Sequence, residues 1–149
     1  MAMAGTPAAM VVGAYAETVG CTFTATMSGD QEAPTPTKAT YKGTAKVTIS
    51  LPANGLGTVC FEISVTGITL PAAAAHIHKG ASGVAGPVVV PFTPPDASGK
   101  VSGCTTNVDP VLTTQIMQNP AGYYVNVHNK DFPGGVIRGQ LVPSAASGS

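Results

Sequence analysis

The sequence predicts an all-β domain with one short helix. Its 18 glycines and 13 prolines separate short runs rich in Val, Ile and Thr, a pattern typical of a β-sandwich. Only 9% of the residues are charged, which is too few for the solvent-facing sides of many helices. With 149 residues the chain is long enough for one domain with a full hydrophobic core.

Alternation of apolar and polar residues predicts the strands of the first half. In residues 21–27 the apolar side chains Phe23, Ala25 and Met27 share one face, and threonines occupy the other. In residues 58–65 the same alternation points Cys60 outward. Further strands are predicted at 44–51, 74–78 and 88–92, the last at a sheet edge because prolines bracket it.

The second half is predicted to contain the helix and two closing strands. Asp109 is suited to cap a helix with Pro110 in its first position, and Pro120 ends it. The closing strands are predicted at 123–128 and 136–142. We expect them to be antiparallel neighbours because only a short, glycine-containing turn joins them.

The two ends of the chain are predicted to lie outside the domain. Residues 1–20 are apolar and contain Ala14-Tyr15-Ala16, an A-x-A cleavage pattern. They are interpreted as a signal remnant or as an arm that docks on the domain or on a second copy, giving a homo-oligomer. Residues 143–149 are predicted to be a flexible tail. No apolar stretch reaches the about 20 residues needed to span a bilayer.

The charge pattern argues against nucleic-acid binding. The chain has 7 Lys and Arg against 7 Asp and Glu, a formal net charge of +0. The basic residues are scattered, whereas phosphate binding requires a basic face.

Three ordered segments resemble one known family. The first is 27–34 (MSGDQEAP), the second is 75–80 (AHIHKG) with the glycines after it, and the third is 123–128 (YYVNVH) followed by 137–141 (IRGQL). Together they resemble the CHRD (chordin-type) domain over about residues 22–142, so a CHRD domain is predicted at 21–142. The family often has an acidic residue before the last motif, where this chain has Val136.

The resemblance implies a fold and a setting more than an activity. It implies an antiparallel, Greek-key-like β-sandwich similar in topology to copper–zinc superoxide dismutase. It also implies an extracellular, cell-surface or periplasmic location. Fold does not determine function, so the functional site has to be argued from the residues.

All three histidines of the chain, His76, His78 and His128, lie in the two best-matching motifs. His76 and His78 point to the same side of their strand, about 7 Å apart. His128 points away from the core face of its own strand. The three imidazoles converge if these two strands are neighbours, and Arg138 and Gln140 are then expected near the same patch.

Three converging imidazoles are a ligand set for one copper or zinc ion, with a fourth position left open. The sequence therefore predicts a binding module with a three-histidine metal site, and copper is favoured by the superoxide-dismutase-like shape. The alternative is that the histidines form a hydrogen-bonded network that supports the glycine-rich loop after residue 79.

Catalysis is not predicted. The chain has no nucleophile elbow, phosphate loop or carboxylate pair, and its acidic residues show no diagnostic spacing. Two other functions remain open. One is a self-assembling extracellular structural subunit that uses the N-terminal arm, and the other is a zinc-dependent hydrolase. The natural ligand is not predicted.

The three cysteines suggest one disulfide and one free thiol in an exported domain. Cys60 and Cys104 lie in the body of the domain and are predicted to pair. The competing possibility joins Cys21 to one of them.

Overall fold

The computed structural model describes residues 18–144. The predictions for residues 1–17 (signal remnant or docking arm) and for the tail residues 145–149 lie outside this range. The homo-oligomer that would use the arm therefore stays a prediction.

Nine antiparallel strands and one α-helix make up the described part of the chain, which confirms the all-β prediction. The elements are β2 (Thr18–Ser28), β3 (Lys42–Pro52), β4 (Gly57–Thr66), β5 (Ala74–Lys79), β6 (Val88–Phe92), β7 (Lys100–Val108), α1 (Pro110–Gln118), β8 (Tyr123–His128), β9 (Ile137–Gln140) and β10 (Val142–Pro143), with short 3-10 turns at Gly29–Gln31 and Pro120–Gly122.

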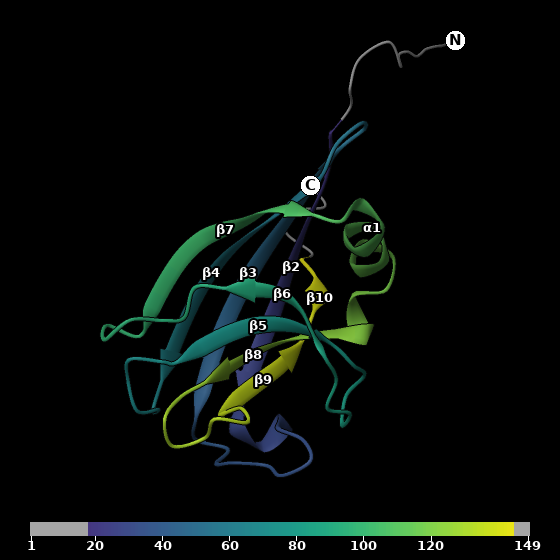
Figure 1. Cartoon of the computed structure of the whole chain (residues 1–149). Coiled ribbons are helices and arrows are strands. Elements are labelled where there is room, and N and C mark those ends of the chain that lie inside the picture. The colour runs from purple at the N-terminus through teal and green to yellow at the C-terminus, as the bar shows by residue number, and fades with distance from the viewer. Residues whose placement is uncertain (1–17, 145–149) are drawn as a thin grey trace.

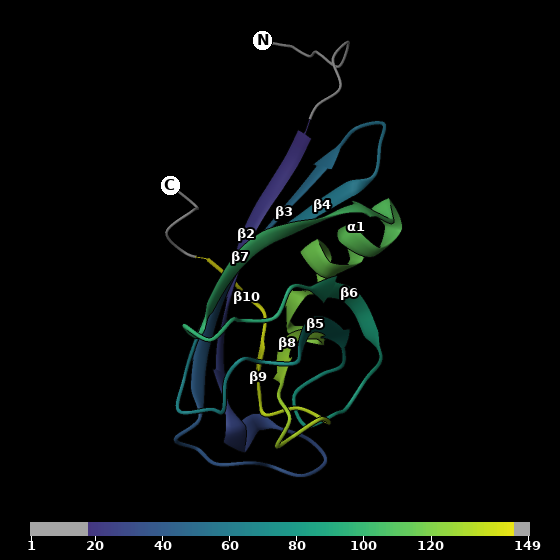
Figure 2. The same cartoon turned by 60° about the vertical axis from the view of Figure 1, so that its left-hand side comes forward.

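The strands form a sandwich from one continuous sheet in the order β6-β5-β8-β9-β2-β3-β4-β7, with β10 pairing with β2. The long strands β2, β3, β4 and β7 form one layer, and the shorter β5, β6, β8 and β9 form the other (Figure 1). The sheet passes between the layers where Ser28 of β2 pairs with Arg138 of β9. Figure 2 shows the two layers side by side, with α1 at one end.

The core lies between the layers and follows the predicted alternation. Phe23, Ala25 and Met27 are buried, as are the four apolar residues of β4, Val59, Phe61, Ile63 and Val65. Such burial of apolar area is the dominant favourable contribution to folding, at about 25 cal/mol per Å².

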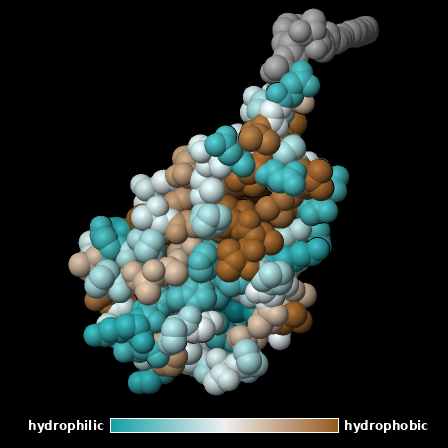
Figure 3. Space-filling view, viewed as in Figure 1, coloured by the Kyte–Doolittle hydropathy of each residue, from teal (hydrophilic) through white to brown (hydrophobic). Residues whose placement is uncertain are grey.

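The helix begins and ends as predicted. The Asp109 carboxylate accepts a hydrogen bond from the backbone N–H of Val111 at 2.8 Å, and Pro110 occupies the first helical position. Ile116 and Thr113 are both fully buried, and α1 closes one end of the sandwich. In the view of Figure 3 apolar surface gathers mainly in this upper half, whereas the opposite end is largely hydrophilic.

Strand β7 was not predicted from the sequence. Its inward positions are Val101, Gly103 and Thr105, which pair with the apolar residues of β4. The ring of Phe61 lies over Gly103, where an added Cβ would be 3.1 Å from the ring. The aromatic ring fills the space of the missing side chain, and this removes the alternation that marks a strand.

Two other boundaries differ from the prediction. β2 begins at Thr18, three positions before the predicted start. The single closing strand predicted at 136–142 is divided at Leu141, which is 1% exposed, into β9 and β10. The predicted antiparallel pairing of the two closing strands is confirmed by the β8–β9 ladder.

The predicted disulfide is confirmed between Cys60 and Cys104, which face each other on β4 and β7. Cys21 is a free thiol. It packs against the core with Phe23 and its neighbours, whereas Cys60 lies on the outer face. Pairing of Cys21 with either bridge cysteine is therefore wrong, because the sheet separates them.

β6 and β7 are the two ends of the strand order, and they meet without pairing. The hydroxyl of Thr105 donates a hydrogen bond to the carbonyl of Pro91 across this seam. Proline has no N–H to donate to a ladder. We therefore describe the sandwich as nearly closed along this side.

No helix within residues 18–144 is both long and apolar enough to cross a membrane.

Candidate metal centre

The three histidines come from the neighbouring strands β5 and β8. In this ladder His76 lies opposite Asn126, His78 opposite Tyr124, and Ala74 opposite His128. The intervening Ile77, Val125 and Val127 are fully buried in the core, so the pleat turns all three imidazoles to the other face. The predicted convergence is confirmed.

The rings lie within metal-binding distance of one another. One nitrogen from each of His76, His78 and His128 can be chosen so that all three lie within 4.8 Å. His76 Nδ1 is 3.3 Å from His128 Nε2. The ring centroids are 5.0 to 5.7 Å apart. Two nitrogens that bind one ion at about 2.0–2.1 Å lie at most about 4.2 Å apart, so small side-chain adjustments would bring the three nitrogens onto a single ion.

Backbone carbonyls fix the direction of two rings. His78 Nδ1 lies 2.9 Å from the carbonyl oxygen of Gly86, and His128 Nδ1 lies 2.9 Å from that of Pro133. A carbonyl accepts hydrogen bonds, so each Nδ1 carries the proton and each Nε2 carries a lone pair. The lone pair of His128 Nε2 faces His76 Nδ1. Histidines that bind metals are commonly oriented in this way.

His78 Nε2 stands out among the polar atoms of the structure. Within residues 18–144 it is the one buried side-chain nitrogen or oxygen without a hydrogen-bond partner. His78 itself is 7% exposed. An unsatisfied buried acceptor costs free energy, and a bound metal ion would satisfy it.

The surroundings keep the imidazoles neutral. Burial, together with the neighbouring His128 and His78, lowers the pKa of His76 to about 4. Burial also lowers the pKa values of His78 and His128. Neutral imidazole is the form that binds metals, so the three rings are ready to bind at pH 7.

His78, Tyr124 and Arg138 form a stack of three planar side chains. The ring of Tyr124 lies 4.9 Å from the His78 ring at an interplanar angle of 9°. The guanidinium of Arg138 lies 3.5 Å from the centroid of Tyr124. The Tyr124 hydroxyl accepts a hydrogen bond from the backbone N–H of Gly86, the residue whose carbonyl holds His78.

Arg138 and Gln140 hold the glycine-rich loop of residues 80–87 over this face. The Arg138 guanidinium donates hydrogen bonds to the carbonyls of Val84 and Ala81 and to the Gln140 side chain. Gln140 donates to the carbonyl of Gly80. Their expected place near the histidine patch is thus correct, but the burial of this face by the loop was not anticipated.

Glu32 is a residue of this face that sequence reasoning did not assign. It is 5% exposed, and its carboxylate accepts a hydrogen bond from the Asn126 side chain at 2.6 Å. Burial raises the pKa of Glu32 to about 7. Its position in the 27–34 segment was the available signal, although that segment is far from the histidines in sequence.

One comparison with known proteins identifies a family. Residues 23–141 match the family model described as CHRD domain. No curated protein and no solved structure matches the chain.

Proposed function

Since the chain belongs to the CHRD domain family, we propose that it is a non-catalytic binding module that holds one copper or zinc ion through His76, His78 and His128. The carrying observation is the convergence of these three rings with an unpartnered, buried Nε2 on His78. A hydrogen-bonded network alone would leave no such atom.

Copper is the preferred ion in this proposal. Imidazole nitrogen suits both Cu(II) and Zn(II), but Cu(II) lies above Zn(II) in the affinity order of divalent ions. Three imidazoles leave a coordination position for water or for an external ligand. His76 is the least buried ring of the three.

Binding is favoured over hydrolysis by the place of the acidic residues. Glu32 is nearly inaccessible to a substrate and is already hydrogen-bonded to Asn126. Glu62 pairs with Lys46 and Ser102 in the other layer of the sandwich. A hydrolase needs a general base within reach of the metal-bound water.

An extracellular, cell-surface or periplasmic location fits the same proposal. The Cys60–Cys104 disulfide is typical of proteins that mature in an oxidising compartment. Copper and zinc ions reach such proteins without competition from cytosolic thiols.

The proposal is tested by titrating Cu(II) and Zn(II) into the metal-free protein by calorimetry. Cys21→Ser serves as the background, because a free thiol is itself a metal ligand. Tyrosine emission gives a second readout, since the chain has 4 Tyr and no Trp and Tyr124 stacks on His78. We expect one ion per chain and quenching by Cu(II).

Two variants separate the site from non-specific binding. His76→Gln removes the ring that makes no backbone hydrogen bond and is expected to weaken binding at least about a hundredfold. Lys130→Ala alters an exposed residue two positions after His128 and is expected to bind as the parent does. Equal affinities of His76→Gln and the parent would refute the site.

A further inference from the structure

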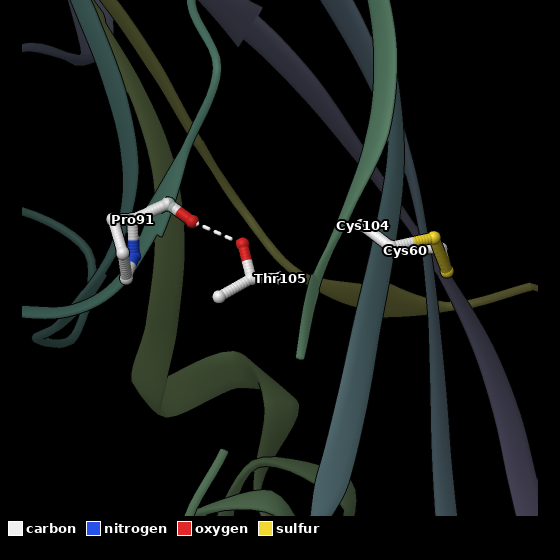
Figure 4. The surroundings of a disulfide bond; sticks show 4 residues. All are labelled: Cys60, Pro91, Cys104 and Thr105. Atoms are coloured by element: carbon white, nitrogen blue, oxygen red, sulfur yellow. Dashed lines mark hydrogen bonds between the residues drawn. A yellow bond between two sulfur atoms is a disulfide. The ribbon is translucent and has the colours of Figure 1, made fainter. Parts of the chain in front are cut away.

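The Cys60–Cys104 disulfide lies on the outside of the sandwich. The two cysteines are direct partners in the β4–β7 ladder, on the face that points away from the core (Figure 4). Cys104 is exposed and Cys60 is half-buried. A surface hollow of ≈ 330 Å³ lies over the bridge, lined by both cysteines, Lys46 and Glu62. An attacking thiolate therefore has access to the sulfur atoms.

The strand that this bridge anchors is the last of its layer. β7 pairs with β4 on one side, and its other side faces β6 across the seam. Thr105, the residue after Cys104, provides the hydrogen bond to the Pro91 carbonyl that crosses this seam, as Figure 4 shows. The covalent anchor and the seam contact are therefore adjacent on β7.

The far side of the seam leads to the histidines. Pro91 of β6 lies opposite His76 of β5 in their ladder. Thr105 and Pro91 thus connect β7 to the strand that carries His76 and His78. The connection runs from the disulfide between β4 and β7, through the Thr105–Pro91 hydrogen bond, to the pairing of Pro91 with His76.

We infer that Cys60–Cys104 is a thiol–disulfide exchange site, and that its reduction loosens the β6–β7 seam and weakens metal binding at the three histidines. The second half of this inference rests on the proposed function. The partner is a dithiol reductant, because the exchange requires two thiols that end as a disulfide of their own.

The exchange balances in two steps. A thiolate of the reductant attacks Sγ of Cys104, forms a mixed disulfide, and releases the Cys60 thiolate, which takes up a proton. The second thiolate of the reductant then attacks the reductant's sulfur atom in the mixed disulfide. This releases the Cys104 thiolate, which also takes up a proton. Two electrons and two protons pass to the protein, and the reductant leaves as a disulfide.

The exchange half is tested on the Cys21→Ser protein with dithiothreitol under native conditions. Free thiols are alkylated and counted by mass, and the rate is compared with the rate of global unfolding in the same buffer. We expect both bridge cysteines to be reduced faster than the protein unfolds. Hydrogen exchange is expected to lose protection in β7 and β6. Reduction no faster than unfolding would overturn the exchange site.

The coupling half is tested with Cys21→Ser, Cys60→Ser, Cys104→Ser, which mimics the reduced state without adding thiol ligands. We expect Cu(II) affinity to fall about tenfold. Thr105→Val keeps the disulfide but removes the seam hydrogen bond, and it is expected to lower the affinity in the same direction even if the serine variant does not fold. Unchanged affinity in Thr105→Val would overturn the coupling.

The two proposals fail in different ways. If the parent binds neither Cu(II) nor Zn(II), the proposed function and the coupling fail together, while alkylation and hydrogen exchange still decide the exchange site. If the parent binds metal but the bridge resists dithiothreitol, the exchange site alone fails.

Discussion

Arg138 is the one arginine of the chain, and it is 1% exposed. Its planar guanidinium donates to two loop carbonyls while stacking on Tyr124. A lysine has a single ammonium and cannot reproduce this fork or the stack. The residue therefore positions the loop of residues 80–87, and through Gly86 it positions His78.

We predict that Arg138→Lys lowers the free energy of unfolding by about 2 kcal/mol, because the buried cation makes fewer hydrogen bonds and loses its stack on Tyr124. Metal affinity is expected to fall about tenfold, since the Gly86 carbonyl no longer holds His78 in place. Denaturant unfolding and calorimetry measure the two effects. Lys130→Ala is the control, and an Arg138→Lys protein with the parent's metal affinity would contradict this role.

The loop of residues 80–87 is an element that the site depends on. Gly86 makes the closest approach in it, because a Cβ there would lie 1.6 Å from the Lys79 carbonyl oxygen. Its N–H and carbonyl bond Tyr124 and His78. No side chain fits at this position without moving the loop.

Gly86→Ala is therefore expected to destabilise the protein by about 1–3 kcal/mol and to weaken metal binding. Gly134→Ala is the matched control, because an added Cβ at Gly134 meets nothing within 4 Å. Thermal unfolding and metal titration of both variants give the comparison. Equal behaviour of the two alanine variants would show that the close approach has no consequence.

Strands with regular alternation were predictable from sequence, and β7 was not. In β2 and β4 every second residue is apolar, because both strands bury one face in the core. In β7 the corresponding position is Gly103, whose space is filled by Phe61 from the neighbouring strand. The apolar group at this position comes from β4, so the residue pattern of β7 alone does not reveal a strand.

The positions of the site histidines were predictable from the same alternation of side chains. Strand pleating placed the three histidines on one face, since Ile77, Val125 and Val127 identify the core side. The cover over that face was not predictable, because Glu32 and the loop of residues 80–87 reach it through long-range contacts. Burial of His78 and the pKa shifts follow from this cover.

The stability of the whole molecule should depend on pH in a defined direction. The unfolded chain protonates its histidines near pH 6.5, whereas the folded chain holds their pKa values lower, with that of His76 at about 4. The stability from these groups is present above pH 6.5 and is lost as the pH falls towards 4. Glu32 opposes this loss, because its pKa of about 7 lets the folded state take up a proton first.

We predict that the free energy of unfolding of the metal-free protein falls between pH 7 and pH 4.5, because three histidines outweigh one carboxyl group. His76→Gln should show a smaller fall and Glu32→Gln a larger one. Guanidinium unfolding with a chelator present measures all three proteins. The same pH dependence in all three would contradict these assignments.

The central claim is that one ion binds where three imidazoles meet, and anomalous X-ray scattering from crystals soaked in Cu(II) or Zn(II) tests it most directly. The account predicts one peak per chain at about 2.0–2.1 Å from a nitrogen of each of His76, His78 and His128. No peak there, or a peak only at Cys21, would contradict it.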